Sequence, residues 1–335
     1  MAHKPDTLVF SGDIGGTKIR LGLWQVSDGS LNLVEDFTIA SVDVSGPVEA
    51  VTTACRGIDL KGLVACFGVA GPVHGGRSRL TNLPWVVDSE SLERELGFER
   101  AVVINDLEAT AWAVPSLQSS SLRQIKGGTA DHDGAVGIIA AGTGLGQVGL
   151  IRSGEKLAVC SGEGGHADFA PQGLLEFELH QFLADRYGHV SWERVLSGPG
   201  LVDLAEFFFG RSDASIEGWL DSLGAADDQA AAVASAGLAG KPEACEAALS
   251  LFVELLGAQA ANLALSLVAT GGVYLAGGIP PKILPAILGG AFTERFLDKG
   301  RMRHLLEAIP VDVVLDQDAP LLGAACRAAG VNVQP

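Results

Sequence analysis

Residues 8–23 of the chain read LVFSGDIGGTKIRLGL. An apolar run precedes Gly12 and apolar residues alternate with others after Lys18, so the stretch predicts two strands joined as a hairpin. Glycines at the tip allow positive φ and let backbone N–H groups approach a ligand closely. Such N–H groups, with a hydroxyl and an ammonium group, suit phosphate oxygens, and the Asp13 carboxylate suits a hydrated Mg²⁺ beside them. Taken alone, the stretch is equally compatible with an ordinary glycine-rich turn.

A second stretch of the same kind lies at residues 135–151, AVGIIAAGTGLGQVGLI. A strand, a Gly/Thr turn and a strand follow one another as in the first stretch, which predicts an internal duplication with two phosphate-binding turns at one nucleotide. Gly144, Gly146 and Gly149 also fit the dinucleotide-binding pattern G-x-G-x-x-G, but that pattern requires a helix after the turn. The residues that follow alternate as in a strand, so we interpret the stretch as a second hairpin.

Composition limits the class of protein. The 335 residues, of which 47% are hydrophobic and 19% charged, are enough for about two domains with a substantial core. The net charge of −17 argues against nucleic acid and anionic membranes as partners. Five cysteines without C-x-x-C spacing, and no apolar signal segment at the start, predict a cytoplasmic protein with reduced thiols. The apolar segment 249–270 contains Glu254, which favours a buried core helix over a membrane span.

Polar side chains follow the predicted buried strand 101–104. Asn105 and Asp106 come at its carboxyl end, where ligands bind in open α/β sheets. An amide beside a carboxylate can hold a sugar hydroxyl and accept its proton. Asn and Asp are also favoured helix N-caps, and both interpretations can hold at once.

Further candidate binding groups lie on predicted loops. Asn82 lies in one of them, where a purely capping role is equally compatible with the sequence. Glu163 and His166 lie on a glycine-rich loop. Their spacing matches no zinc pattern, so hydrogen bonds to neighbouring hydroxyls are the better interpretation. Glu193 is expected in the first turn of a helix, where favouring the helix dipole is an alternative role.

Periodicity and turn residues predict the remaining elements. A strand pair is expected over 30–39, and a helix over 189–196 that Gly198-Pro199-Gly200 stops. The other expected strands are 63–70, 273–279 and 311–315, and the other expected helices are 48–55, 89–96, 174–187, 201–209, 216–223, 242–270 and 320–329.

Together these motifs resemble those of the bacterial glucokinase family, within the hexokinase/actin-like ATPase superfamily. The matching stretches are in the family's order: 12–17, 104–106, 142–146, 163–171, 193–200 and 275–279. The resemblance implies an α/β, two-domain actin-like ATPase (ribonuclease H-like) fold, with duplicated hairpin-containing sheets and a cleft between the domains. We expect a small α/β domain over 1–115, with a C-terminal helix within 320–335 packing back on it, and a large α/β domain over 116–319.

The resemblance also implies a reaction, the ATP-dependent phosphorylation of glucose to glucose 6-phosphate, which is the first step of glycolysis. Asp106 would be the catalytic base for the 6-hydroxyl, and Asp13 would hold Mg²⁺ through water. The implied substrate-binding residues are Asn82, Asn105, Asp106, Glu163, His166 and Glu193. The implied ATP-binding residues are Gly12, Asp13, Ile14, Gly15, Gly16, Thr17, Gly142, Thr143, Gly144, Gly277 and Gly278.

Some features set this chain apart from related families. Lys18 stands where the glucokinase family more often has Asn. Related sugar kinases and repressors often carry a Cys-rich zinc motif after the histidine, and residues 167–171 contain no Cys, so we expect no structural zinc. The resemblance suggests a homodimer. Two alternatives stay open, a kinase for another hexose or an amino sugar, and a nucleotide-binding module without sugar chemistry, although such a module has no need for the polar set around Asp106.

Overall fold

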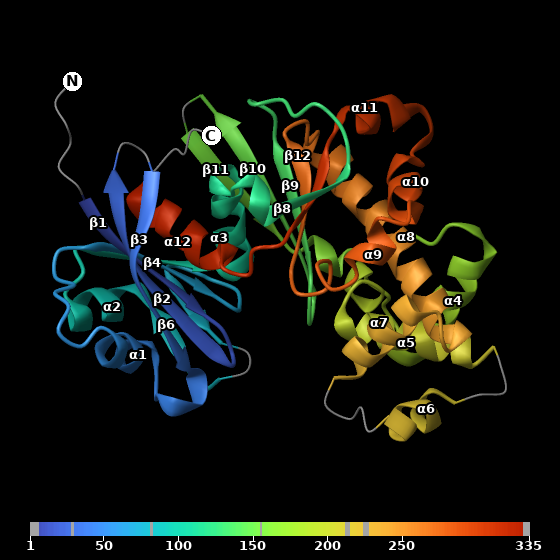
Figure 1. Ribbon diagram of the computed structural model, residues 1–335, viewed down its shortest axis with the longest axis horizontal. Coiled ribbons are helices and arrows are strands. Elements are labelled where there is room, and N and C mark those ends of the chain that lie inside the picture. Colours follow the sequence, from blue (N-terminus) through green and yellow to red (C-terminus); the bar gives the residue numbers. More distant parts are fainter. Residues whose placement is uncertain are drawn as a thin grey trace. The chain divides into compact units, whose positions relative to one another are not determined.

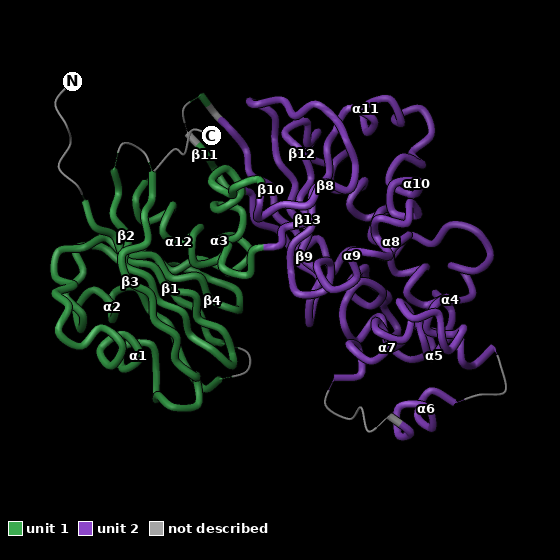
Figure 2. Tube along the Cα trace, in the orientation of Figure 1, with its two compact units in different colours: residues 1–119, 153–159, 316–335 green, residues 120–152, 160–315 purple. Residues whose placement is uncertain are grey.

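The computed structural model describes residues 7–27, 30–80, 83–154, 156–211, 215–223 and 228–330. The chain forms two compact units (Figure 2): unit 1 comprises residues 1–119, 153–159 and 316–335, and unit 2 comprises residues 120–152 and 160–315. Each unit has its own sheet and its own hydrophobic core. The boundaries expected from the sequence, 115/116 and 319/320, lie near the changes between units, whereas the assignment of 153–159 to unit 1 has no counterpart in that expectation.

The sheet of unit 1 has the strand order β3-β2-β1-β4-β7 (Figure 1). Its strands are β1 (Thr7–Ile14), β2 (Lys18–Ser27), β3 (Ser30–Ala40), β4 (Val64–Val69) and β7 (Arg100–Asn105). β1 and β2 form the predicted antiparallel hairpin, and β1, β4 and β7 run parallel. The strand pair predicted over 30–39 is wrong, because this segment forms the single strand β3, which pairs along the whole of β2. A bulge at Leu23/Trp24 absorbs the extra residue of β3.

Helices cover both faces of this sheet. α1 (Pro47–Ala54) and α2 (Ser89–Leu96) contribute to a core that contains Phe10, Phe67 and Phe98, whose ring centroids lie 5.5–6.0 Å apart. α3 (Asp106–Ala113) and α12 (Ala319–Ala329) pack on the other face with Val9 and Trp24. A short hairpin of β5 (Arg77–Arg79) and β6 (Val86–Asp88) precedes α2.

The last helix of the chain, α12, lies very close to α3. A Cβ atom at Gly323 of α12 would overlap the backbone carbonyl of Ala109 in α3, so only glycine permits this approach. The helix expected over 320–329 is therefore present and belongs to the core of unit 1. Its position matters for the site, because α3 begins with Asp106.

The sheet of unit 2 repeats the topology of the first. Its strands are β8 (Leu122–Lys126), β9 (Val136–Ala141), β10 (Leu145–Ser153), β11 (Lys156–Gly162), β12 (Gly272–Ala276) and β13 (Val311–Val314); residue 153 and residues 156–159, where β10 ends and β11 begins, are counted with unit 1. The order β11-β10-β9-β12-β13-β8 matches that of unit 1 strand for strand, with β8 added antiparallel at the edge. β9 and β10 form the second predicted hairpin, and β9, β12 and β13 run parallel. The duplication inferred from the two hairpin stretches is confirmed at the level of topology.

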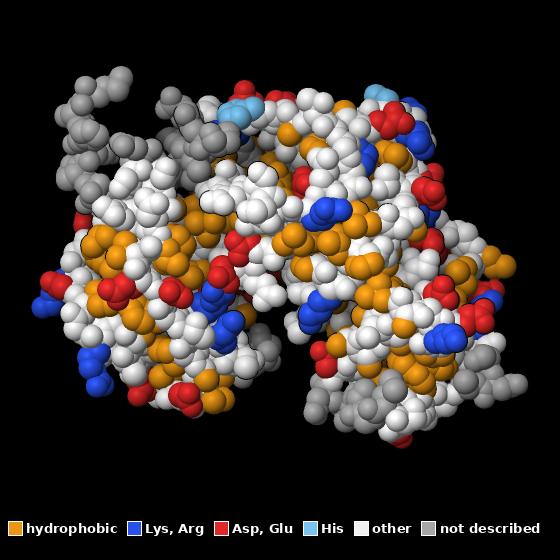
Figure 3. Space-filling view, viewed as in Figure 1, with side chains coloured by type: hydrophobic (Ala, Val, Ile, Leu, Met, Phe, Trp, Pro, Cys, Tyr) orange, Lys and Arg blue, Asp and Glu red, His pale blue; other side chains and the backbone are white. Residues whose placement is uncertain are grey.

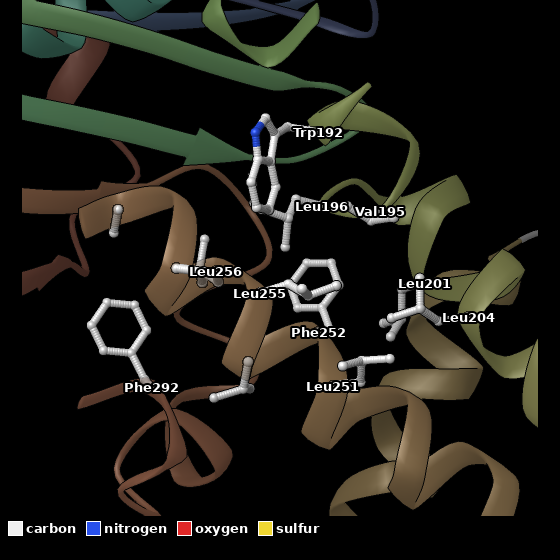
Figure 4. Packing of buried hydrophobic residues seen from close by; sticks show 14 of the residues in the cluster. Trp192, Val195, Leu196, Leu201, Leu204, Leu251, Phe252, Leu255, Leu256 and Phe292 are labelled. Atoms are coloured by element: carbon white, nitrogen blue, oxygen red, sulfur yellow. The ribbon is translucent and has the colours of Figure 1, made fainter. Parts of the chain in front are cut away.

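The helices of unit 2 are built around α8. They are α4 (Gly173–Tyr187), α5 (Gly198–Phe209), α6 (Ile216–Leu223), α7 (Gln229–Ala239), α8 (Glu243–Leu267), α9 (Leu284–Ile287), α10 (Ala291–Leu297) and α11 (Arg303–Ala308). Figure 4 shows Leu251, Phe252 and Leu255 of α8 among side chains of α5 and α10. Among the described residues α8 is the single helix long and apolar enough to span a membrane, but 78% of its most apolar window is buried in the protein, which confirms the predicted core helix.

The helix predicted over 189–196 is wrong. Only a single 3₁₀ turn forms there, at Trp192–Arg194, and Gly198-Pro199-Gly200 opens helix α5 instead of stopping a helix. Proline is favoured in the first turn of a helix, where its missing N–H costs no hydrogen bond. The Ser197 hydroxyl caps this start by accepting a hydrogen bond from the N–H of Gly200 at 3.1 Å.

The sequence has a net charge of −17. On the face shown in Figure 3, acidic and basic side chains nevertheless lie interspersed among hydrophobic ones. The acidic excess is therefore not gathered into one patch on this face.

Candidate functional site

The tip of the first hairpin is pinned by backbone and hydroxyl contacts. The N–H of Gly15 donates to the carbonyl of Lys18 at 3.0 Å, and the N–H of Ser41 donates to the carbonyl of Thr17 at 2.9 Å. The Ser41 hydroxyl also donates to the carbonyl of Gly15 at 3.0 Å. Because these bonds fix the tip from behind, the backbone of Gly16 and Thr17 keeps a defined shape where a phosphate could bind.

Two of the predicted ATP-binding residues of this stretch lie in the core. Gly12 is buried, and a Cβ atom there would overlap the ring of Phe67 on β4. The Ile14 side chain is also fully buried. Glycine is thus required at position 12 for packing, and these two residues could meet a nucleotide only through their backbone.

Two carboxylates meet at the carboxyl edge of the sheet in unit 1. Asp13 lies at the end of β1, and Asp106 follows β7, with β4 between these parallel strands. Gly68 of β4 keeps the space between them small, because a Cβ atom there would lie 3.1 Å from the Cβ of Ala109 and 3.8 Å from the Cα of Asp106. The geometry is the one expected at a ligand-binding edge of an α/β sheet.

Burial raises the pKa of both carboxylates, and the neighbouring charge adds to the rise for Asp13. Burial and the charge of Asp106 raise the pKa of Asp13 from 3.8 to about 6, against the opposing charges of Arg20 and Lys18. Burial also raises the pKa of Asp106, although the N–H of Leu107, which donates to its Oδ1 at 2.8 Å, acts in the opposite direction. Carboxylates with raised pKa values in one place are characteristic of functional sites.

Asn105 caps helix α3, which is one of the two roles predicted for it from the sequence. Its Oδ1 accepts a hydrogen bond from the N–H of Leu107 at 2.9 Å and so caps α3, while its Nδ2 donates to the carbonyl of Gly71 at 3.2 Å. The capping interpretation of Asn105 is confirmed. The cap fixes the first turn of α3, and with it the direction of the Asp106 side chain.

Positive charge lies next to Asp13. Arg20 stands directly opposite Asp13 in the β1–β2 ladder and forms an ion pair with Asp318, the residue that precedes α12. Lys18 begins β2 and is exposed. The Arg20–Asp318 pair joins the first hairpin to the last helix of the chain.

In unit 2 three glycine segments converge. The carbonyl of Gly142 accepts a hydrogen bond from the N–H of Gly198 at 2.8 Å, and the carbonyl of Ala141 accepts one from the N–H of Ile279 at 3.1 Å. Gly277 has φ +87°, a conformation that L side chains rarely adopt, and a Cβ atom there would overlap the backbone of Ala141. The Gly142–Gly144 turn and the Gly277–Gly278 segment, predicted to bind ATP from distant parts of the sequence, are thereby brought together.

A cavity of about 820 Å³ opens beside these segments. Gly142, Thr143 and Gly278 lie on its wall, and side chains of α4, α5, the start of α7 and the segment before α9 complete it. Its volume is within the range of small-molecule sites. The charged lining residues are Arg186, Asp203, Glu206, Asp228 and Lys282.

Three of the six residues predicted to bind the sugar lie near one another in unit 2. Glu193 Oε2 accepts a hydrogen bond from the N–H of Leu145 at 3.0 Å, while its Oε1 lies 3.8 Å from Nδ1 of His166. The other ring nitrogen of His166 lies 3.9 Å from Oε2 of Glu163. Gly144 is required beside them, since a Cβ atom there would lie 2.6 Å from Glu193 Oε2.

The loop that carries Glu163 and His166 is held by its neighbours. Gly165 presses on the backbone of Leu145, where any side chain would overlap. The N–H of Trp192 donates to the carbonyl of Ala167 at 3.0 Å. The glycines therefore serve close packing, while the two polar side chains stay exposed.

Comparison with known proteins identifies the family. The family model described as Glucokinase matches residues 10–331. The chain belongs to the glucokinase family. The glucokinase of Nostoc punctiforme (strain ATCC 29133 / PCC 73102) is 40% identical over 341 residues, covering 96% of this chain and 99% of that protein. The crystal structure of a glucokinase from an Antarctic psychrotroph is 32% identical with a TM-score of 0.86, covering 96% of this chain and 99% of that one.

More distant structures share the fold of the glucokinase family. A ROK family glucokinase from Streptomyces griseus, solved in complex with glucose and AMPPNP, has a TM-score of 0.60 at 24% identity, covering 96% of this chain and 99% of that one. Family membership confirms the resemblance drawn from the sequence, and these structures confirm the two-domain actin-like fold class.

Within this glucokinase-family chain, the residues fit Mg²⁺ bound with its water. Among the residues that the structure describes, no group of three or more His, Cys, Asp or Glu side chains could hold a metal ion. Mg²⁺ does not require such a cage, because it keeps several waters and is held by one or two carboxylates plus substrate phosphates. The half-buried carboxylate of Asp13 at the tip of the first hairpin has the oxygen atoms that this chemistry needs.

The sequence of this glucokinase-family chain did not mark some residues near the site, and one predicted site residue is not described by the structure. Arg186 and Asp203 on the cavity wall, and Asp318 beside Arg20, carry no local motif that could have marked them. Asn82, predicted to bind substrate, lies outside the described residues.

Proposed function

We propose that this protein transfers the γ-phosphoryl group of ATP to the 6-hydroxyl of glucose, giving glucose 6-phosphate. The observation that carries the proposal is the pair Asp13 and Asp106 at one edge of the sheet, in a chain of the glucokinase family. In phosphoryl transfer the protein mainly positions the reactants and neutralises charge. Two carboxylates with separate roles, one toward the nucleotide and one toward the sugar, meet that need.

We assign the role of general base to Asp106. The start of α3 holds its side chain, and burial raises its pKa, so the carboxylate is a stronger proton acceptor for a sugar hydroxyl than a free aspartate is. Orientation of that hydroxyl in line with the γ-phosphorus would follow from the same contact. Asn105, Glu163, His166, Glu193 and Asn82 are assigned to the remaining sugar hydroxyls, on the family resemblance.

The two hairpin turns are assigned to the nucleotide phosphates. The N–H groups of Gly16 and Thr17, and those of Thr143 and Gly144, would donate to phosphate oxygens, while the N–H groups of Gly15 and Gly142 hold the two turns by donating to the carbonyls of Lys18 and Gly144. Mg²⁺ when bound neutralises charge on the β- and γ-phosphates, and Asp13 would hold it through water. The cavity beside Gly278 is the candidate site for the adenosine.

A coupled assay tests the reaction and its substrate class. Purified protein with Mg–ATP is given glucose, mannose, fructose or N-acetylglucosamine, and ADP release is followed. We expect glucose-dependent ADP release and glucose 6-phosphate as the product. Sugar-independent ATP hydrolysis with no phosphorylated sugar would favour the nucleotide-binding module, and a preference for another sugar would reassign the substrate.

The Asp106→Ala variant tests the assignment of the base. Loss of a positioned general base reduces kcat by about 10²–10⁴-fold, and the Kd for ATP should stay near the wild-type value, since Asp106 is assigned to the sugar. Asp43→Ala, which removes an exposed acid of the same unit, is the matched control. Near-normal kcat in a folded Asp106→Ala enzyme would show that another group takes the proton.

A further inference from the structure

Asp13 and Arg20 share one face of the sheet in unit 1. They are direct partners in the antiparallel β1–β2 ladder, and side chains of such partners stand side by side. Val9 and Trp24 on the same face contact α12, so this is the face that α3 and α12 cover. Only 15% of the Arg20 side chain is exposed. A guanidinium group is therefore confined next to the carboxylate assigned to Mg²⁺.

A second carboxylate engages that guanidinium group. Asp318 forms an ion pair with Arg20, and its own side chain is 53% exposed. Asp318 is the residue before α12, and the position of α12 is fixed by the contact of Gly323 with Ala109. The fold thus holds Asp318 at a constant place beside the hairpin.

The carboxylates of Asp13 and Asp318 compete for the guanidinium group of Arg20. Guanidinium and carboxylate groups form strong, often bidentate, hydrogen bonds, and such a pair would cover the oxygens of Asp13. A hydrated Mg²⁺ needs those oxygens as acceptors for its water. An arginine so near a magnesium ligand is compatible with metal binding only if something else engages it.

We propose that Asp318 is a positioning residue that retains the Arg20 guanidinium and so leaves Asp13 free for the magnesium–nucleotide complex. The proposal rests on the proposed function, because it takes Asp13 as the metal-side carboxylate. It gives Asp318, at the start of α12, a part in nucleotide binding. No motif of the sequence indicates that part.

Binding of Mn²⁺ in the presence of ADP tests this directly. Free Mn²⁺ is measured by electron paramagnetic resonance with the full-length protein, with no sugar and no turnover. We expect Asp318→Asn to weaken Mn²⁺–ADP binding by about 5- to 20-fold, the size of coupling seen between charged neighbours. Asp318→Glu should restore binding to within twofold of the wild type, and kinetics should show a raised KM for Mg–ATP with kcat nearly unchanged.

A double-mutant cycle separates positioning from a general charge effect. In an Arg20→Gln background there is no guanidinium to retain, so adding Asp318→Asn should change Mn²⁺–ADP binding by less than about twofold. Asp59→Asn, which removes an exposed acid of the same unit, controls for net charge. Thermal melts establish that every variant is folded.

The outcomes are distinct. Equal Mn²⁺–ADP binding by the wild type and Asp318→Asn would overturn the inference while leaving the proposed function in place. A loss that persists in the Arg20→Gln background would also overturn it, since Asp318 would then act only as a negative charge. A wild-type protein that neither binds Mn²⁺–ADP nor phosphorylates glucose would overturn both.

Discussion

Replacing Asp13 with Asn should stabilise the ligand-free protein while abolishing its activity. The raised pKa of Asp13 means that the folded protein holds this proton more tightly than the unfolded chain does, so the ionised carboxylate destabilises the fold. A rise from 3.8 to about 6 corresponds to about 3 kcal/mol above pH 6, at 1.36 kcal/mol per pKa unit. Asn keeps the shape of the side chain and removes the charge.

The pH dependence follows from the same shift. As the pH falls from about 6 toward 3.8 the folded wild type takes up the proton first, so its disadvantage shrinks through that window and is gone below it. In magnesium-free buffer at pH 7.5 we expect Asp13→Asn to melt roughly 6–12 °C higher, at 2–4 °C per kcal/mol. At pH 5 the difference should be about half as large.

The assay is a thermal melt of wild type and variant over this pH range, with chelator present. Asp43→Asn, a charge removal at an exposed position of the same unit, should shift the melting temperature little at any pH. The reasoning fails if Asp13→Asn is no more stable than the wild type at pH 7.5. It also fails if the gain is the same at pH 5, because a pH-independent gain cannot come from the charge.

Two further predictions concern packing and backbone conformation. Gly323→Ala should destabilise unit 1 by about 3 kcal/mol or more, because the added methyl group would overlap the Ala109 carbonyl of α3 and overpacking costs 1–3 kcal/mol. A chemical denaturation curve equal to that of the wild type would contradict this prediction. Val268 ends α8 with φ +50° and a side chain that is 55% exposed, so Val268→Asn should raise the free energy of unfolding by about 1 kcal/mol, because Asn tolerates this left-handed conformation. Val268→Ala, which lacks the side-chain amide that lets Asn hydrogen-bond locally in this conformation, is its control and should gain less.

The features that could be predicted from the sequence are those that depend on residues close together in the chain. Both glycine hairpins, the buried strands and the cap at Asn105 formed as expected, because alternation, apolar runs and capping preferences are properties of neighbouring residues. The prediction was wrong at Gly198-Pro199-Gly200, because these residues can either end one helix or begin another; here they begin α5, which Ser197 caps. The strand pair expected over 30–39 was wrong because the partner of that segment is β2.

The parts of the site that escaped prediction depend on contacts between distant segments. Nothing near Asp318 in the sequence points to Arg20, and only the packing of α12 on α3 brings the two together. The cavity in unit 2 is also lined by segments distant in the sequence, among them α4, α5 and the segment before α9. In the sequence their polar residues resemble those of any exposed helix face, because only the fold brings them together.

The placement of α12 also constrains how the protein is made. On a ribosome, residues 7–113 emerge long before α12 does, and at 5–20 residues per second the delay is on the order of 10–40 s. During that time the face of the sheet with Val9, Trp24 and Cys66 lacks α12 and has only α3 to cover it. Unit 2 has all its residues by 315 and can finish folding before α12 is available to unit 1. A chaperone that shields exposed apolar surface would therefore meet this protein at its N-terminal sheet.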